Sequence, residues 1–452
     1  MIAAVPSVTF AGLTVSPGDA NDPQFGAVVV EGIAIRYGRT SPFEQPAPGS
    51  ATVSFVVSEG KADFLVQPAG KSLQVIIPTG AGNRTVFRGT VDTARVRFWK
   101  VRKSDGKKLF RFECTVVDPL APISEMTQFQ GVSRPAETAT ARLIAIENQI
   151  LSSYPGLING LGGGSAYPYL LWAGEQSGSL LDQLAAIYTT VGEVLWYDAG
   201  TNRLEAAGHV RYLDVTGGPL EMVAVNGKYA CTAAGNPGRS LRSKDHRVEA
   251  LDDAKVDKES AIRGVQARGK LLDGNYNKEI DWNVFVDTAG GVSTLQVDSK
   301  AYAVGPPNSD VGIRATANLW ASVANDNAGL QHPPIRAVFR DGFDNTEAVN
   351  FWLAGREQRV AFFIGGSAYS VLKPGKGTFV RTIGGTIAYR RQHGGEMAWE
   401  AEMNLAPVAM NYDTPPVTCA NVNPNYATKP VRLADLDDTV TCEALGFTGK
   451  GI

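Results

Sequence analysis

One stretch near the C-terminal end of the sequence alternates strictly between apolar and polar side chains. Its apolar members are Met397, Trp399, Ala401, Met403 and Leu405, and the polar residues between them include Glu400, Glu402 and Asn404. Successive side chains of a β-strand point to opposite faces, so this period of two predicts a strand with one buried face. The preceding segment TIAYRRQ leads into His393-Gly394-Gly395, a tight-turn sequence. We therefore predict a β-hairpin here, with Trp399 packed into its core.

The same strand and turn pattern fills the first quarter of the chain. Between Gly26 and about Val117, apolar and β-branched runs alternate with turn-rich text: GAVVVEGIAIRYG, ATVSFVVS, two or three strands within KSLQVIIPTGAGNRTVFRGTVDTARVRFWKV, and KKLFRFECTVV. No helical period separates them, and 49 Gly and 25 Pro residues in the whole chain supply many tight turns. Residues 1–125 are thus expected to form a small antiparallel β domain, barrel-like or sandwich-like.

Residues 126–215 have the pattern of a small α/β domain. The Pro-rich text from Asp118 to Pro135 is expected to be a linker, and Glu137 to Leu151 a helix with apolar residues on one face. A second helix is marked by Ser179 and Asp182 at capping-box spacing and by Gly192 at the C-cap position. EVLWYDAGTNRLEAAG then predicts a strand, a turn and a strand.

Strand patterns return in residues 216–410, which we interpret as a second barrel-like β domain with insertions. SAIRGVQARGKL, EIDWNVFVD and QRVAFFIGG predict strands, and VGIRATANLWASVAN predicts a helix. The fold class expected for the chain is therefore mainly β, with a small α/β domain in the middle. Residues 411–452 are Pro-rich and polar, and are expected to form an extended C-terminal arm.

The composition excludes several classes of protein. The 452 residues carry 43 Lys and Arg against 45 Asp and Glu, a formal charge of −2, and a nucleic-acid-binding protein needs basic residues in excess. We saw no run of Lys and Arg, so tight nucleic-acid binding is not expected. The N-terminal sequence lacks the basic region of a secretion signal, and no apolar run is long enough for stable membrane insertion.

Each motif that could carry catalysis has a simpler structural interpretation. The pentapeptide Gly-Gly-Ser-Ala-Tyr occurs at 163–167 and 365–369, but Tyr stands where a nucleophile elbow has Gly, so a turn is expected. The stretch 160–164 is Gly-rich but lacks the Lys of a phosphate-binding loop, and Pro168 after it argues against the helix start that such a loop needs, so a flexible loop is expected. We therefore predict no enzyme, no catalytic residue and no cofactor.

Metal sites are not expected either. The four histidines, His209, His246, His332 and His393, are too dispersed for a zinc site. Asp435, Asp437 and Asp438 lack the Gly and distal Glu of a calcium loop. Cys114 alternates within a strand and is expected to be a small core residue. A disulfide between Cys419 and Cys442 is left open, with the reduced state favoured for a protein made in a cytoplasm.

Five segments, in their order along the chain, resemble the minor tail proteins of long-tailed phages of actinobacteria. They are IRYGRTSPFEQPAPGSATVSFVV, VFRGTV, ETATARLIAI, SLLDQLAAIYTTVGEVLWYDAGTNRL and MAWEAEMNLAP. The match extends over residues 26 to 407, departs from the familiar pattern between Pro219 and Gln358, and does not include the arm. In this group the two β domains are similar to those of baseplate hub proteins, which form a three-fold ring beneath the tail tube.

The resemblance implies a structural virion protein of the phage tail tip, made and assembled in the cytoplasm of the host bacterium. As a ring-shaped hub it would self-associate as a homotrimer, join the tail tube to the distal tip and let DNA pass. Its further partners would be the distal tail protein, the tape measure protein, and tip or fibre proteins. Two alternatives stay open: a six-fold distal tail protein, and a receptor-binding or cell-wall-degrading tail protein.

Overall fold

The computed structural model divides the chain into two compact units, residues 1–407 and 408–452. All residues whose structure is described belong to the first unit. They are 5–19, 28–60, 67–79, 82–127, 137–160, 170–171, 178–208, 220–225, 228–233, 246–250, 255–256, 262–273, 278–288, 292–303, 310–327, 330–331, 335–339, 358–363, 378–391 and 397–407.

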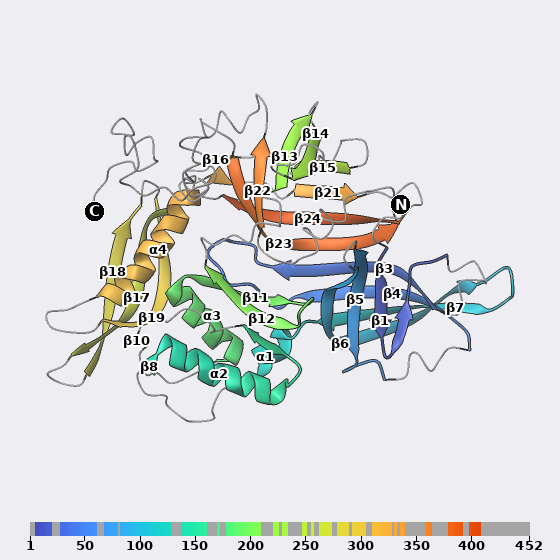
Figure 1. Cartoon of the computed structure of the whole chain (residues 1–452), viewed down its shortest axis with the longest axis horizontal. Helices are drawn as coiled ribbons and strands as arrows, with labels where there is room; N and C mark the ends of the chain where they lie inside the picture. The colour runs from blue at the N-terminus through green and yellow to red at the C-terminus, as the bar shows by residue number, and fades with distance from the viewer. Residues whose placement is uncertain are drawn as a thin grey trace, which may run out of the picture. The chain divides into compact units, whose positions relative to one another are not determined.

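Seven antiparallel strands form the N-terminal region (Figure 1). They are β1 (Ser7–Phe10), β2 (Leu13–Val15), β3 (Val28–Gly38), β4 (Ser50–Ser58), β5 (Ser72–Thr79), β6 (Gly82–Val101) and β7 (Lys108–Val117). Their order across the sheet is β2-β1-β5-β6-β7-β4-β3, and a single bridge between Pro17 and Val30 connects the segment after β2 to β3. The strands predicted from Gly26 onward are confirmed, whereas β1 and β2 were missed.

The N-terminal sheet curves around an aromatic core. The ring centroids of Phe10 and Phe55 lie 6.2 Å apart, and those of Phe55 and Phe112 lie 6.0 Å apart. Cys114 is fully buried in the same cluster, which confirms it as a core residue, and burial raises the pKa of its thiol to about 12. Phe10 belongs to β1, so the missed strand supplies a central part of the core.

Seven later strands pair side by side in a series whose last strand also pairs with its first. They are β13 (Leu220–Val225), β14 (Lys228–Ala233), β15 (His246–Ala250), β21 (Ile335–Phe339), β22 (Gln358–Phe363), β23 (Thr378–Arg391) and β24 (Met397–Pro407). The pairings run β23-β22-β13-β14-β15-β21-β24 and return to β23, with a single residue pair joining β14 to β15. The mainly β fold class is confirmed.

Strand β23 connects this circuit to the N-terminal sheet. Its residues Gly384 to Tyr389 pair with β3, from Gly38 back to Ile33, while its other edge pairs along β24. Trp399 is 2% exposed and lies in one core cluster with the N-terminal strands, as does Leu405. The predicted strand and the burial of Trp399 are confirmed.

The face of β24 that was predicted to be polar and exposed is buried at Glu400. Glu400 is only 2% exposed and forms ion pairs with Arg336 of β21 and with Arg390 of β23, the latter at 2.6 Å. Burial alone would raise the pKa of Glu400, but hydrogen bonds from the two guanidinium groups outweigh it and hold the pKa below its usual value. The partly exposed side chains of Arg336 and Arg390, from the strands on either side, cover Glu400, whereas Glu402 on the same face is exposed as predicted.

Three helices and a small sheet form the α/β region. The helices are α1 (Leu120–Glu125), α2 (Ala139–Ser153) and α3 (Leu180–Val191), and the sheet is β11 (Glu193–Asp198), β12 (Arg203–Gly208) and β9 (Ile158–Gly160). The capping box of Ser179 and Asp182 and the left-handed Gly192 cap are confirmed. The expected linker after Asp118 is wrong in its first part, because α1 buries Leu120 and Ile123 against α3.

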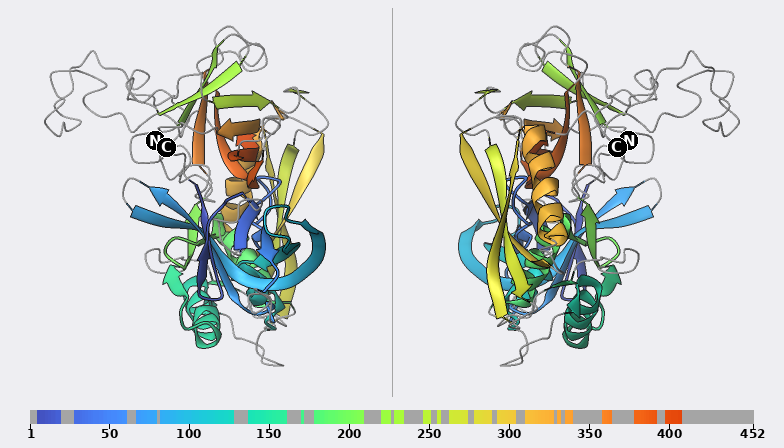
Figure 2. Two further views of the ribbon diagram at one scale, coloured as in Figure 1. Left: turned by 90° about the vertical axis from the view of Figure 1, so that its right-hand side faces the viewer. Right: turned by 90° about the vertical axis from the view of Figure 1, so that its left-hand side faces the viewer.

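A five-stranded sheet carries the helix predicted at VGIRATANLWASVAN. Strands β18 (Lys278–Asp287), β17 (Ile262–Asp273), β19 (Ser293–Ala303), β10 (Leu170–Leu171) and β8 (Glu137–Thr138) lie in this order. Helix α4 (Val311–Asn327) packs along β17, β18 and β19 (Figure 2). A two-stranded pair, β16 (Lys255–Val256) with β20 (Leu330–Gln331), completes the described elements.

Several sequence features lie outside the described residues. They are both Gly-Gly-Ser-Ala-Tyr segments, residues 161–164, the turn that contains His393, His209, His332, the acidic residues Asp435, Asp437 and Asp438, Cys419 and Cys442, and the whole of 411–452. His246 lies on β15. Among the described helices, none is long and apolar enough to cross a membrane.

Candidate interaction surface

The most distinctive surface belongs to the hairpin formed by β6 and β7. Strand β5 accompanies β6 only as far as Thr90, and the backbone of Val91 still bonds to Gly70 and Lys71. From Asp92 to Val101, β6 pairs with β7 alone among the described strands. This part of β6 is therefore an edge, with backbone donors and acceptors along one side.

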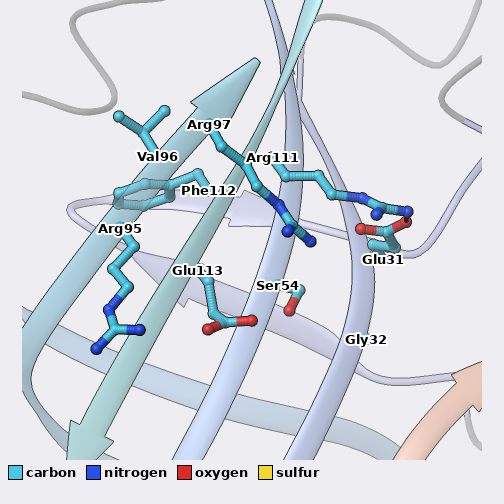
Figure 3. Close-up of a pocket in the computed structure, with 9 residues that line it drawn as sticks. All are labelled: Glu31, Gly32, Ser54, Arg95, Val96, Arg97, Arg111, Phe112 and Glu113. Atoms are coloured by element: carbon cyan, nitrogen blue, oxygen red, sulfur yellow. Dashed lines mark hydrogen bonds and ion pairs between the residues drawn. The ribbon is translucent and has the colours of Figure 1, made fainter. Parts of the chain in front are cut away.

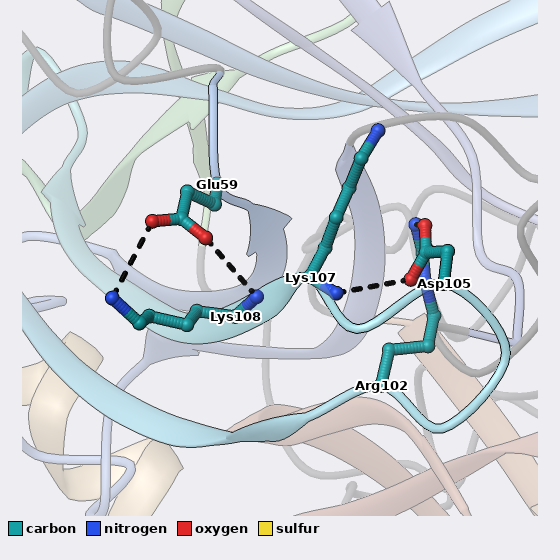
Figure 4. A network of polar contacts seen from close by, with 5 residues as sticks. All are labelled: Glu59, Arg102, Asp105, Lys107 and Lys108. Carbon is teal, nitrogen blue, oxygen red and sulfur yellow. Dashed lines mark hydrogen bonds and ion pairs between the residues drawn. The ribbon is translucent and has the colours of Figure 1, made fainter.

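The tip of the hairpin is held by a local polar network (Figure 4). The guanidinium of Arg102, almost fully buried, donates to both carboxylate oxygens of Asp105, with Nε to Oδ1 at 2.8 Å. This hydrogen bonding lowers the pKa of Asp105 to about 2. Lys108 reaches Glu59 at 3.5 Å, which ties the hairpin to the end of β4. A turn built in this way presents β6 in one fixed conformation.

The hairpin is strongly basic and carries exposed apolar side chains. Residues 95–108, RVRFWKVRKSDGKK, contain seven Lys and Arg and one Asp. Val96 and Phe98 are 57% and 55% exposed, and the Phe98 ring packs edge-on against Phe110 at 6.0 Å. The expectation that the sequence has no run of Lys and Arg is wrong here, because the balanced total charge conceals it. Exposed apolar groups rimmed by charge are typical of a protein interface.

One side of the hairpin borders a concavity of about 590 Å³ (Figure 3). Its lining includes Arg95, Arg97 and Arg111, together with Glu31 and Glu113. Arg111 forms an ion pair with Glu31 at 2.5 Å, and Arg97 pairs directly across the strands with Arg111. Like charges opposite each other destabilise a hairpin, and the Glu31 carboxylate beside Arg111 offsets that repulsion here.

A second concavity, of about 660 Å³, lies where β3 meets the β23–β24 hairpin. Arg36, Thr386 and Glu402 line it, and the amide of Asn404 donates to the carbonyl of Arg39 at 3.4 Å. Within its lining, the Thr40 hydroxyl donates to the Glu44 carboxylate at 3.0 Å, an exposed contact local to the segment after β3. This cavity is part of the junction between the sheets.

The sequence predicts no catalytic, cofactor or metal residue, and the described residues contain no group of three or more His, Cys, Asp or Glu that could hold a metal ion.

Asp118, which directly follows β7, is a buried acid whose pKa is strongly shifted. Its carboxylate accepts backbone N–H groups of Gly49 at 2.8 Å and Leu120 at 2.9 Å, and burial raises its pKa to about 7. These contacts give Asp118 a structural position between β4 and α1.

Two solved structures match nearly the whole described architecture. The tail protein from Neisseria meningitidis MC58 aligns with a TM-score of 0.50 and 12% identity, over 88% of this chain and 95% of that one. The 43 kDa tail protein of prophage MuSo2 from Shewanella oneidensis aligns with a TM-score of 0.50 and 11% identity, over 88% and 98%. No family model and no curated protein matches the sequence. The chain therefore has the fold of these tail proteins.

Proposed function

We propose that the protein is a structural component of a phage tail tip, a ring-shaped hub that joins the tail tube to the distal tip and lets DNA pass. The observation that carries the proposal is the fold shared with two tail proteins over almost the full length of all three chains. The resemblance of five sequence segments to minor tail proteins of actinobacterial phages supports the same role and adds the narrower family. The proposed location of the protein is the virion, at the tail tip.

We assign a proposed role to each region of the chain. Residues 1–125 and 216–410 would be the two β domains of the hub, 126–215 a small α/β domain between them, and 411–452 an arm that contacts a neighbour. Two similar domains in each of three subunits would approximate the six-fold symmetry of a tail tube. We propose a homotrimer for this reason, with a closed ring as its symmetry.

The proposed partners are other tail proteins, namely the distal tail protein, the tape measure protein, and tip or fibre proteins. The proposal includes no tight binding of nucleic acid, because a lumen that DNA crosses quickly should not retain phosphates. The basic hairpin at 95–108 would then face a protein neighbour rather than the lumen. A DNA-retention assay with the purified protein tests this directly.

Antibody labelling tests the proposed place in the particle. Antibodies raised against the purified chain, viewed by negative-stain electron microscopy on intact phage, should mark the tail tip on the axis. Label on fibres away from the axis would instead favour the receptor-binding alternative. A zymogram on host cell walls addresses the degrading enzyme: we expect no clearing, and a cleared band would contradict a purely structural role.

A further inference from the structure

Among the strand edges that the described residues leave unpaired, two belong to long strands in different sheets and carry exposed apolar side chains. One is β6 from Asp92 to Val101, and the other is β18, which pairs with β17 alone. Long exposed edges invite pairing with another chain, and soluble proteins usually cover or interrupt them. Each of these edges also carries exposed apolar side chains, so each needs a partner of matching chemistry.

The edge of β6 is basic on one face and apolar on the other. Its pairing with β7 is regular between the irregularities near Asp92 and Trp99, so side chains from Thr93 to Phe98 alternate. Arg95 and Arg97 share one face, and Val96 and Phe98 share the opposite face. No acidic residue occurs between Thr93 and Val101.

The edge of β18 has the complementary pattern. Asp281 and Asp287 are exposed and share a face with Phe285, which is 46% exposed. Ile280 is 41% exposed and lies on the other face, beside the α4 side of the sheet, where Val284 packs. The edge therefore offers two carboxylates together with Phe285 on one face, and Ile280 as the exposed apolar side chain on the other.

We infer that the β6 edge of one copy pairs with the β18 edge of a second copy. An antiparallel register that sets Arg95 opposite Asp281 also sets Val96 opposite Ile280, so the ion pair lies on one face of the joint sheet and the apolar pair on the other. Cross-strand pairs of both kinds stabilise sheets, and edge addition is a common mode of recognition.

The two edges suit a ring because they are different surfaces. Within the unit of residues 1–407, Figure 1 draws β18 at the left end and the β6–β7 hairpin toward the right end. An interface between unlike surfaces repeats head to tail and closes into a ring when the rotation allows. The inference rests on the proposed hub function, and the contact between β6 and β18 is the one that would close the ring.

A charge exchange between the edges tests the inference. The full-length protein and the variants Arg95→Glu and Asp281→Arg are each followed by sedimentation velocity from micromolar to about millimolar concentration. We expect concentration-dependent association of the wild type, at least tenfold weaker association of either variant alone, and recovery in the double variant that carries both changes. Recovery is specific, because in the double variant a reversed β6 meets a reversed β18 at every contact of the ring.

Two controls carry the same change of charge outside the proposed register. Lys103→Glu alters the hairpin turn, and Asp287→Arg lies six residues from Asp281 on the same strand; both should associate within about twofold of the wild type. A wild type that stays monomeric throughout, or single variants at Arg95 and Asp281 that associate like the wild type, would overturn the edge pairing. Tip labelling of intact particles would still stand in either case, so the two proposals fail separately. A β6 edge that retains a labelled DNA duplex rather than a second copy would also overturn it.

Discussion

Tyr389 and Trp399 lie directly opposite each other on β23 and β24, with ring centroids 5.1 Å apart. Both are buried in the cluster that contains Phe10 and Phe55 of the N-terminal strands. The last described hairpin of the chain thus completes the core of the first β region. Folding of the N-terminal strands is therefore expected to depend on residues nearly 400 positions later in the chain.

Trp399→Ala should lower the free energy of unfolding by about 3–5 kcal/mol, the usual cost of removing a fully buried aromatic side chain. The Trp399 ring is 2% exposed and packs on Tyr389, so the cavity would open between the two β regions. Chemical denaturation with circular dichroism measures the loss. Melting behaviour like that of the wild type would contradict the packing described here.

Gly38→Ala should destabilise the junction of β3 and β23 by about 1–3 kcal/mol through steric overlap. A Cβ at this position would lie 2.5 Å from the Cα of Gly384, and Gly38 has a φ of 77°, which favours glycine. Gly156→Ala is the matched control, because a Cβ there meets no atom within 4 Å. Equal melting temperatures for the two variants would show that β3 and β23 do not approach so closely.

The stability contributed by Asp118 should fall as the pH rises. Burial raises its folded pKa from 3.8 to about 7, so the folded state holds the proton more tightly between these values. The contribution is complete below about pH 4, is lost as the pH rises through 7, and amounts to about 4 kcal/mol at most. The unfolding free energy of the wild type minus that of Asp118→Asn should therefore decrease by up to about 4 kcal/mol from pH 4 to pH 8. An increase of this quantity with pH would mean that the backbone N–H groups of Gly49 and Leu120 dominate.

Deletion of residues 411–452 should leave a folded protein that assembles less well with its neighbours. These residues belong to the second compact unit, and the described core is complete by Pro407. Thermal melting and incorporation into tails measure the two effects separately. Loss of cooperative melting on deletion would show that the arm contributes to the core of the first unit.

Local patterns in the sequence predicted much of the fold, and pairing over long distances was not predictable. The capping box of Ser179 and the alternation around Trp399 depend on residues close in sequence, and both were correctly interpreted. The burial of Glu400 depends on Arg336, some sixty residues earlier, so no local pattern signals it. The pairing of β23 with β3 is equally remote.

Part of the candidate interaction surface was predictable from the sequence. The run from Arg95 to Lys108 is visible in the sequence, and counting charge in short windows rather than over the whole chain would have found it. That β6 is an edge strand there could not be foreseen, because it requires knowing that β5 ends its pairing at Thr90. The free edge of β18 likewise depends on the order of strands in its sheet.

A reconstruction of intact particles at a resolution that separates subunits decides whether the protein is a hub of the tail tip. We expect three copies of this chain in a ring on the tail axis, beneath the tail tube and open to DNA. Copies placed off the axis as fibres, or a surface of the protein gripping nucleic acid, would contradict it.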